Sequence, residues 1–269
     1  MYDISLTMPA IRTNNWEAFY ESAKQSCSNH SFELVLVSPF ELPNSLKSIN
    51  NITHILDKGN PSRCTQIANI AAKGKLIYNC VDDGLFFNSA LDWVVDEFNH
   101  LHNDLDVINM RYRESSDRKC GEFPLTYWNT SYHSSLRLPG INPSWKLSLH
   151  FVMKRHTYLS LGGIDCNFEY SNHGIHDLMF RIQAAGGTIF NSLVEGLNCT
   201  HFPGQVADHG PINDAQLYHD EPIFNSIYSN PQAAYKRKYL DLDNWMMQPQ
   251  VWERRFYREI TKYEDLING

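Results

Sequence analysis

The chain has 269 residues, of which 42% are hydrophobic and 13% aromatic, so it carries enough apolar side chains to bury a large core. We expect one large domain, or one domain with a subdomain. The formal net charge of −7 argues against non-specific binding to nucleic acid. The one short basic run, residues 235–239, reads as the solvated face of a helix.

Neither a signal peptide nor a membrane span is expected. The opening residues Met1 to Ser5 do not resemble a signal peptide, and no segment has the roughly 18 apolar residues that a span requires. The six cysteines form no CxxC pair and no even ladder, which predicts reduced, mostly buried thiols. Together these features predict a cytoplasmic protein.

The first half of the chain alternates β-rich and helical segments. β-Rich runs at residues 3–8, 32–37, 52–56 and 76–81 alternate with helix-like spacing at 16–25, 64–73 and 89–100. This order predicts a mainly parallel sheet with right-handed crossovers and flanking helices. The polar stretch at 114–143 is long for a plain connection, so we expect a lid or a binding segment there.

The most informative motif is the pair Asp82–Asp83, which follows the strand predicted at 76–81 and precedes Gly84. Parallel strands present ligand sites at their carboxyl ends, and carboxylate oxygens suit Mg²⁺ or Mn²⁺. An Asp-Gly pair is also favoured in tight hairpin turns. By itself the pair leaves both interpretations open.

A second cluster of polar residues surrounds a helix predicted over 177–185, which Gly186 and Gly187 would end. In this prediction Asp177 lies in the first turn, where the helix dipole stabilises a carboxylate. Asp177 is then either a general base that faces a cleft or a capping residue paired with Arg181. A β-rich segment follows, and His201 comes just after it, where a side chain can face a site.

In this order the segments resemble glycosyltransferases of the GT-A fold, specifically the large inverting, family-2-like group that uses nucleotide-diphospho-sugars. The resemblance covers residues 3–204. It implies a GT-A, Rossmann-like domain over residues 1–210, with a mixed, mainly parallel sheet flanked by helices. Residues 211–269 would form an α-rich extension packed on that domain. No family motif covers the extension, so covering the site and forming a homodimer surface stay open as its roles.

The resemblance also implies nucleotide and metal sites. Residues 4–12 look like the family's opening strand and nucleotide loop, and residues 63–69 look like the helix whose arginine faces the nucleotide. The tripeptide at 81–83 looks like the metal motif, with Asp82 near the ribose or a metal-bound water. The implied nucleotide-binding residues are Pro9, Ala10, Arg12, Ser38, Arg63 and Asp82, and the implied ligands of Mn²⁺ or Mg²⁺ are Asp83 and His201.

For the acceptor side, residues 162–165 resemble the family's acceptor turn, and Asp177 stands at the position of its general base. Asp165 is the next candidate for that role. Two positions depart from the family: Ser38 replaces the usual acidic end of the second strand, and His176 replaces the acid before the base. Four aromatic residues either stack on the acceptor sugar or pack in the core: Tyr127, Trp128, Tyr132 and Trp145.

The function that the resemblance implies is transfer of a sugar, with inversion, from a UDP- or GDP-linked donor to a glycan, lipid-linked or protein acceptor. One alternative is a protein that keeps the fold and binds a nucleotide-sugar or glycan without turnover. Another is a zinc hydrolase, for which the histidine spacing is unlike that of the known helical zinc motifs. Its candidate ligands would be His201, His209, His219 and either Asp208 or Asp220.

Overall fold

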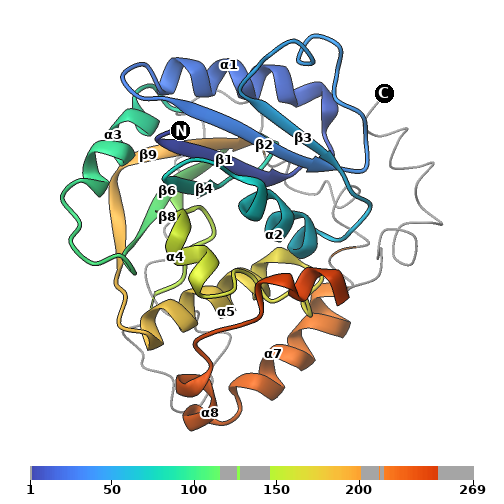
Figure 1. Ribbon diagram of the computed structural model, residues 1–269, viewed down its shortest axis with the longest axis vertical. Coiled ribbons are helices and arrows are strands. Elements are labelled where there is room, and N and C mark those ends of the chain that lie inside the picture. The colour runs from blue at the N-terminus through green and yellow to red at the C-terminus, as the bar shows by residue number, and fades with distance from the viewer. Residues whose placement is uncertain (1, 116–125, 128–145, 201–211, 213–214, 248–269) are drawn as a thin grey trace.

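The computed structural model describes residues 2–115, 126–127, 146–200, 212 and 215–247. These residues form an α/β fold in which one mixed sheet lies between helices on its two faces (Figure 1). The strand order is β3-β2-β1-β4-β8-β6-β9-β5, with β7 paired to β6. Six of the candidate site residues named above lie outside the described part of the chain: Trp128, Tyr132, Trp145, His201, Asp208 and His209.

The bounds of the elements are as follows. The strands are β1 (Ile4–Pro9), β2 (Phe32–Ser38), β3 (Ile52–Leu56), β4 (Leu76–Asn79), β5 (Gly84–Phe86), β6 (Val107–Ser115), β7 (Thr126–Tyr127), β8 (Phe151–Lys154) and β9 (Ile189–Thr200). The helices are α1 (Trp16–Ser26), α2 (Pro61–Ala71), α3 (Ala90–Phe98), α4 (Arg155–Ser160), α5 (Ser171–Ala184), α7 (Glu221–Tyr228) and α8 (Pro231–Lys236). The 3-10 helices are η1 (Thr13–Asn15) and η4 (Leu242–Met247), and η3 (Gln216–Asp220) is a π-helix.

The sheet has a parallel half and a mixed half. Strand β1 pairs in parallel with β2 and β4, and β2 pairs in parallel with β3, which confirms the parallel sheet predicted for the first half. Strand β8 runs antiparallel to both β4 and β6, and β5 runs antiparallel to β9. The second half of the sheet is therefore mixed, because β8, which the sequence pattern does not predict, enters between β4 and β6.

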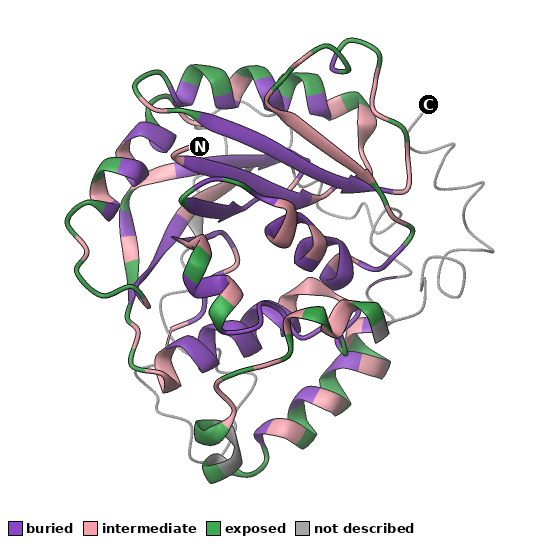
Figure 2. Ribbon diagram, viewed as in Figure 1, coloured by how far each residue is buried: buried purple, intermediate pink, exposed green. Residues whose placement is uncertain are grey.

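One face of the sheet is covered by α1 and α3. The apolar residues of α1 recur at the helical spacing i, i+3, i+4 and i+7, and all four are buried: Trp16, Phe19, Tyr20 and Ala23. They pack with alternate residues of β1, such as Leu6, while the outer face of the helix is exposed (Figure 2). Helix α1 therefore lies where its sequence pattern predicts.

The other face carries α2, α4 and α5, and α7 packs against α5. Side chains on the opposite face of the strands, such as Val35 and Ile77, form a second core with Phe180 of α5. Phe224 and Tyr228 of α7 belong to the same core. Residues beyond 211 thus contribute apolar side chains to the main body of the fold.

Two helices begin earlier than the sequence predicts, and both starts matter for the site. Helix α2 begins at Pro61, because the side chain of Asn60 accepts a 2.8 Å hydrogen bond from the Arg63 N–H and proline suits a first helical position. Helix α5 begins at Ser171, so the predicted start at Asp177 is wrong. The carboxylate of Asp220 accepts from the backbone N–H of Tyr170 at 2.7 Å, and that tertiary contact fixes the chain entering α5.

The cysteines in the described residues are all free and buried, as predicted. None of the helices in the described parts of the chain combines the length and apolar character that crossing a bilayer requires.

Candidate functional site

A cavity of about 360 Å³ lies at the carboxyl ends of the parallel strands. Pro9, Ala10 and Arg12 line it from the end of β1 and the loop that follows, and Asp82 and Asp83 line it from the turn after β4. Open α/β sheets commonly bind ligands at this edge. Five of the residues predicted to bind nucleotide or metal are therefore brought together around one cavity.

Asp82 connects the loop after β1 to the turn after β4, and both of these segments line the cavity. Its Oδ2 accepts hydrogen bonds from the backbone N–H of Ile11 at 2.7 Å and of Arg12 at 2.6 Å, and the indole of Trp16 lies at 3.3 Å. Its Oδ1 lies 2.6 Å from the guanidinium of Arg12. Asp82 is only 2% exposed, and these contacts fix the shape of the loop after β1.

Asp83 lies beside Asp82, and the Asp-Gly pair does not form a tight hairpin. Strand β5, which follows Gly84, pairs with β9 and not with β4, so the chain does not fold back on itself at this turn. Asp83 Oδ2 lies 3.9 Å from the Arg12 guanidinium. The cavity thus contains two adjacent carboxylates with one arginine between them.

Arg63 does not line the cavity, although its helix does through Pro61, Cys64 and Thr65. The guanidinium of Arg63 makes a bidentate contact with Asp57, with Nε at 2.9 Å from Oδ1 and Nη2 at 2.8 Å from Oδ2. Its Nη1 donates to the carbonyl of Trp245 at 2.7 Å, and the charge lies 4.9 Å from the Trp245 ring centre. These contacts support a role in joining η4 to the sheet.

Ser38 also lies outside the cavity lining, between Val37 and Pro39, which are both part of it. It is buried, and its hydroxyl accepts a 3.0 Å hydrogen bond from the Phe40 N–H. Ser38 therefore shapes the end of β2, while its neighbours present an apolar surface to the cavity.

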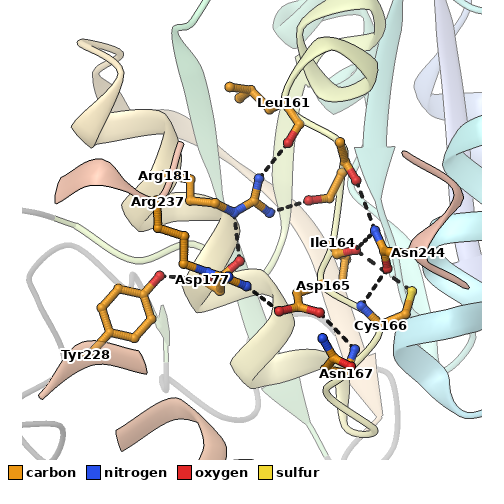
Figure 3. A network of polar contacts seen from close by, with 12 residues as sticks. Leu161, Ile164, Asp165, Cys166, Asn167, Asp177, Arg181, Tyr228, Arg237 and Asn244 are labelled. Carbon is orange, nitrogen blue, oxygen red and sulfur yellow. Dashed lines mark hydrogen bonds and ion pairs between the residues drawn. The ribbon is translucent and has the colours of Figure 1, made fainter. Parts of the chain in front are cut away.

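Asp177 lies in the middle of α5, away from the cavity lining, and is fully buried (Figure 3). Its Oδ2 accepts from Arg181 Nε at 2.7 Å, and its Oδ1 accepts from the Tyr228 hydroxyl at 2.7 Å and from Arg237 Nε at 2.9 Å. Burial acts to raise the pKa of Asp177, but the two arginines and the tyrosine outweigh it and hold the pKa below its usual value. This environment supports the pairing with Arg181 that the sequence offered as the alternative to a general base.

Asp165, the second candidate base, belongs to the same network and also lies outside the cavity lining. Burial, and then the charge of Asp177, raise the pKa of Asp165, although Arg237 forms an ion pair with it. Arg237 comes from the basic run at 235–239, so the interpretation of that run as a solvated face is wrong at this position. Its guanidinium pairs with the buried carboxylates of Asp165 and Asp177, so the side chain lies against the fold.

The predicted acceptor turn at 162–165 has a structural explanation. Gly162 and Gly163 have φ values of 80° and 67°, a left-handed conformation that favours glycine. Arg181 Nη1 donates to the carbonyl of Leu161 at 2.8 Å and Arg181 Nη2 to that of Gly163. The turn is therefore held against α5 by the same arginine that pairs with Asp177.

His150 also lines the cavity, just before β8, although no sequence motif points to it. Burial lowers the pKa of His150 to about 4, against smaller opposing effects of the Asn79 carbonyl and the Asp83 charge, so the imidazole is neutral at pH 7. Its ring lies 4.6 Å from that of Tyr112, another lining residue, in an edge-on arrangement. A histidine next to a short apolar run was the available signal, but β8 itself was not recognised.

The groups at the cavity that suit a hard divalent cation such as Mg²⁺ are the carboxylate oxygens of Asp82 and Asp83. Among the described residues, no three histidine, cysteine, aspartate or glutamate side chains gather closely enough to hold a metal ion. Sites for Mg²⁺ often use one or two carboxylates together with substrate phosphates, and one carboxylate at a cavity edge fits that chemistry. Asp83, which lines this edge of the cavity, is the carboxylate that the sequence predicts for the role.

The zinc-hydrolase alternative gains no support from its described residues. The Nδ1 atom of His219 lies 2.8 Å from Asp220 Oδ1. The Asp220 carboxylate also accepts hydrogen bonds from the backbone N–H groups of Glu169 and Tyr170. Neither His219 nor Asp220 lines the cavity.

No protein-family model matches the sequence, and no curated protein matches it significantly. Among solved structures, the fold is similar to that of S. aureus TarS. The crystal structure of TarS 1–349 has a TM-score of 0.57 at 11% identity, over 98% of this chain and 74% of that chain. TarS 1–349 in complex with UDP has a TM-score of 0.56 at 14% identity, over 98% of this chain and 75% of that chain.

A further TarS crystal structure has a TM-score of 0.53 at 13% identity, and 47% of its chain is covered. At these identities the similarity concerns the fold. Together with the order of strands and helices, it identifies the architecture of this chain as the GT-A, Rossmann-like fold.

Proposed function

We propose that the protein is a glycosyltransferase that moves a sugar from a nucleotide-diphospho-sugar to an acceptor hydroxyl. The observation that carries this proposal is the junction at Asp82, where the loop after β1 and the Asp82–Asp83 turn meet at one cavity. Support also comes from the TarS structure in complex with UDP, which has a similar fold. A UDP-linked donor is therefore the first to test, with a GDP-linked donor second.

The cavity divides into regions that suit the parts of such a donor. Pro9, Val37 and Pro39 offer an apolar surface to a flat nucleobase, at the ends of β1 and β2. Arg12 offers a positive charge to the diphosphate, and guanidinium groups bind phosphate oxygens strongly. In this proposal Asp82 does not touch the ribose but keeps the Arg12 loop in place.

Asp83 would hold a divalent cation, Mn²⁺ or Mg²⁺, together with the donor diphosphate. Such a cation, when bound, neutralises the leaving diphosphate and contributes several kcal/mol to the transition state. The cation and its ligands are proposals that rest on the donor chemistry of Asp83. His201, the second predicted ligand, stays a prediction because it lies outside the described residues.

Transfer also needs a group that takes the proton of the acceptor hydroxyl. A base must reach that proton, and the buried, doubly paired carboxylate of Asp177 is poorly placed to do so. We therefore assign Asp177 a structural role, as the partner of Arg181 and Arg237. Inversion at the anomeric carbon rests on the family resemblance alone.

One observation favours the second candidate function, which is binding of a nucleotide-sugar without turnover. The residues of α5 that line the cavity are Ser171, Asn172 and Ile175, and none of them carries a carboxylate. A base for the acceptor would then have to come from elsewhere. The two functions share the donor site and differ only in turnover.

The experiment is calorimetry on the purified chain with UDP, GDP and other nucleoside diphosphates, with and without Mn²⁺. A ligand present at about 100 times its dissociation constant should also stabilise the fold by ~2.7 kcal/mol in a thermal-shift assay. We expect Mn²⁺-dependent binding of one nucleotide, which Asp83→Asn should abolish while the melting temperature stays near that of the wild type.

The release of nucleoside diphosphate from matching nucleotide-sugars then separates the two functions. Release in the presence of a glycan or lipid-linked acceptor supports the transferase, and tight binding without release supports the binding protein. If no nucleotide binds with or without Mn²⁺, both functions are excluded.

A further inference from the structure

Two residues that line the cavity each carry a buried polar atom with no hydrogen-bond partner among the described residues. These atoms are the hydroxyl oxygen of Thr65, on α2, and the side-chain carbonyl oxygen of Asn79, at the end of β4. Thr65 is 1% exposed and Asn79 is 5% exposed. Because a buried polar group without a partner costs free energy, each such group in a fold needs an explanation.

The orientation of the Asn79 amide follows from its other contact. Its Nδ2 donates a 2.9 Å hydrogen bond to the carbonyl of Leu149, in the segment that leads into β8. If the amide were flipped, its oxygen would face the carbonyl oxygen of Leu149. This contact therefore identifies Oδ1 as the side-chain atom that lacks a hydrogen-bond partner among the described residues. Asn79 thus presents a hydrogen-bond acceptor to whatever occupies the cavity.

Thr65 is unusual in a different way. A threonine inside a helix generally points to solvent or donates to the carbonyl one turn earlier. Thr65 does neither, since it is buried and its hydroxyl bonds to no atom of the described residues. Its hydroxyl can therefore both donate to and accept from a bound ligand.

We propose that Thr65 and Asn79 recognise hydroxyl groups of the donor sugar, a proposal that rests on the function proposed above. A sugar carries several neighbouring hydroxyls, each of which is both a donor and an acceptor. Asn79 lies on β4 and bonds to Leu149, on the β8 side of the cavity. The apolar surface of Val37 and Pro39 lies at the end of β2, on the other side of β1 and β4.

That separation is the reason to assign Asn79 to the sugar and not to the base, and Thr65 joins it as the second residue of the cavity lining with a buried polar atom that has no partner among the described residues. A nucleobase suits the apolar region near β2, whereas a polyol requires polar partners. A site that offers buried hydrogen-bonding groups also discriminates strongly against analogues that lack the matching hydroxyl. Thr65 and Asn79 would accordingly contribute to the choice of sugar.

The test compares nucleoside diphosphates with nucleotide-sugars. Thr65→Val keeps the shape of the side chain and removes only the hydroxyl, and Ser62→Ala is the matched control. Ser62 also lies on α2 with a buried hydroxyl that has no partner among the described residues, but it does not line the cavity. The probes are UDP and GDP, UDP-glucose, UDP-N-acetylglucosamine and GDP-mannose, each titrated by calorimetry.

We expect Thr65→Val to weaken binding of the preferred nucleotide-sugar by about tenfold, with the affinity for the free nucleoside diphosphate unchanged. Asn79→Leu should act in the same direction, and Ser62→Ala should change neither affinity. The melting temperature of Thr65→Val should not fall, because the hydroxyl bonds to no described residue. A deoxy analogue of the sugar should lose affinity for the wild type and much less for Thr65→Val.

Two results would overturn the inference while leaving the proposed function intact. An equal loss for nucleoside diphosphate and nucleotide-sugar would place the pair at the nucleotide. Unchanged affinities in Thr65→Val and Asn79→Leu would mean that ordered water satisfies these atoms. A wild-type protein that binds no nucleotide at all would overturn the proposed function, and this inference with it.

Discussion

Arg237 donates from Nε to Asp177 Oδ1 at 2.9 Å, although the two residues are 60 positions apart in the sequence. The same guanidinium also pairs with Asp165, so it joins the segment after α8 to two parts of the main body (Figure 3). Arg181 and Tyr228 complete the shell around the Asp177 carboxylate. The carboxylate is thus the centre of a buried ionic network that connects the helices beyond residue 211 to α5.

The first prediction concerns the stability that this network contributes. Asp177→Asn leaves Arg181, which is fully buried, and Arg237 without their main countercharge. Breaking a buried ion pair by removing one partner costs about 3–5 kcal/mol, and we expect the free energy of unfolding to fall by that amount in a urea titration. The exposed pair of Asp104 and Lys154 is the control, and Asp104→Asn should change stability little.

The opposite result would restore the general-base interpretation. In that case Asp177→Asn would fold as stably as the wild type, bind donor normally and lose turnover by ~10²-fold or more.

The second prediction concerns Arg63, which was expected to contact the nucleotide. Because its guanidinium is held by Asp57 and the Trp245 carbonyl, Arg63→Ala should lower the free energy of unfolding by roughly 3 kcal/mol and leave nucleotide affinity unchanged. Arg12→Ala is the matched comparison, since Arg12 lines the cavity and should affect affinity more. Loss of affinity in folded Arg63→Ala, at an unchanged melting temperature, would show that Arg63 does reach the nucleotide.

The third prediction separates the two adjacent carboxylates. Asp82 accepts hydrogen bonds from two backbone N–H groups and lies 2.6 Å from the Arg12 guanidinium, whereas Asp83 Oδ2 lies 3.9 Å from it. Asp82→Asn should lower the melting temperature and also weaken nucleotide binding, because the loop after β1 loses its anchor. Asp83→Asn should affect Mn²⁺-dependent binding with a smaller change in melting temperature. Equal melting temperatures for the two variants would contradict the anchoring role of Asp82.

The fourth prediction is a pH dependence that arises from His150. Burial lowers the pKa of His150 to about 4, against 6.5 for an unperturbed histidine, so between these values the unfolded chain binds a proton that the folded chain does not. Above pH 6.5 His150 therefore causes no pH dependence of stability. As the pH falls from 6.5 towards 4, protonation of the unfolded chain lowers the free energy of unfolding by about 3 kcal/mol.

The neutral variant His150→Gln should flatten this part of the profile, measured by urea titration from pH 7 to pH 4. The difference between wild type and variant isolates His150 from other groups, including His54, whose pKa burial also lowers. Parallel profiles for the two proteins would show that the imidazole titrates normally in the folded state.

Local sequence patterns predict several elements of the fold and the place of the cavity. The four apolar positions of α1 predicted both the helix and its buried face, and the runs at 32–37 and 52–56 predicted β2 and β3. The motif at Asp82–Asp83 predicted the location of the cavity, because strand direction brings the ends of β1 and β4 to one edge. In each case spacing along the chain carries the information.

The long-range partners of the buried charged side chains depend instead on how the chain packs. Arg63 and Asp177 both lie on helices that border the site, yet each is drawn to a partner that no local pattern specifies, Trp245 and Arg237 respectively. The start of α5 likewise depends on Asp220, which is 50 residues from the Tyr170 N–H that it binds. A buried charge must find a countercharge or a hydrogen-bond partner, and in a folded chain that partner comes from wherever packing places one.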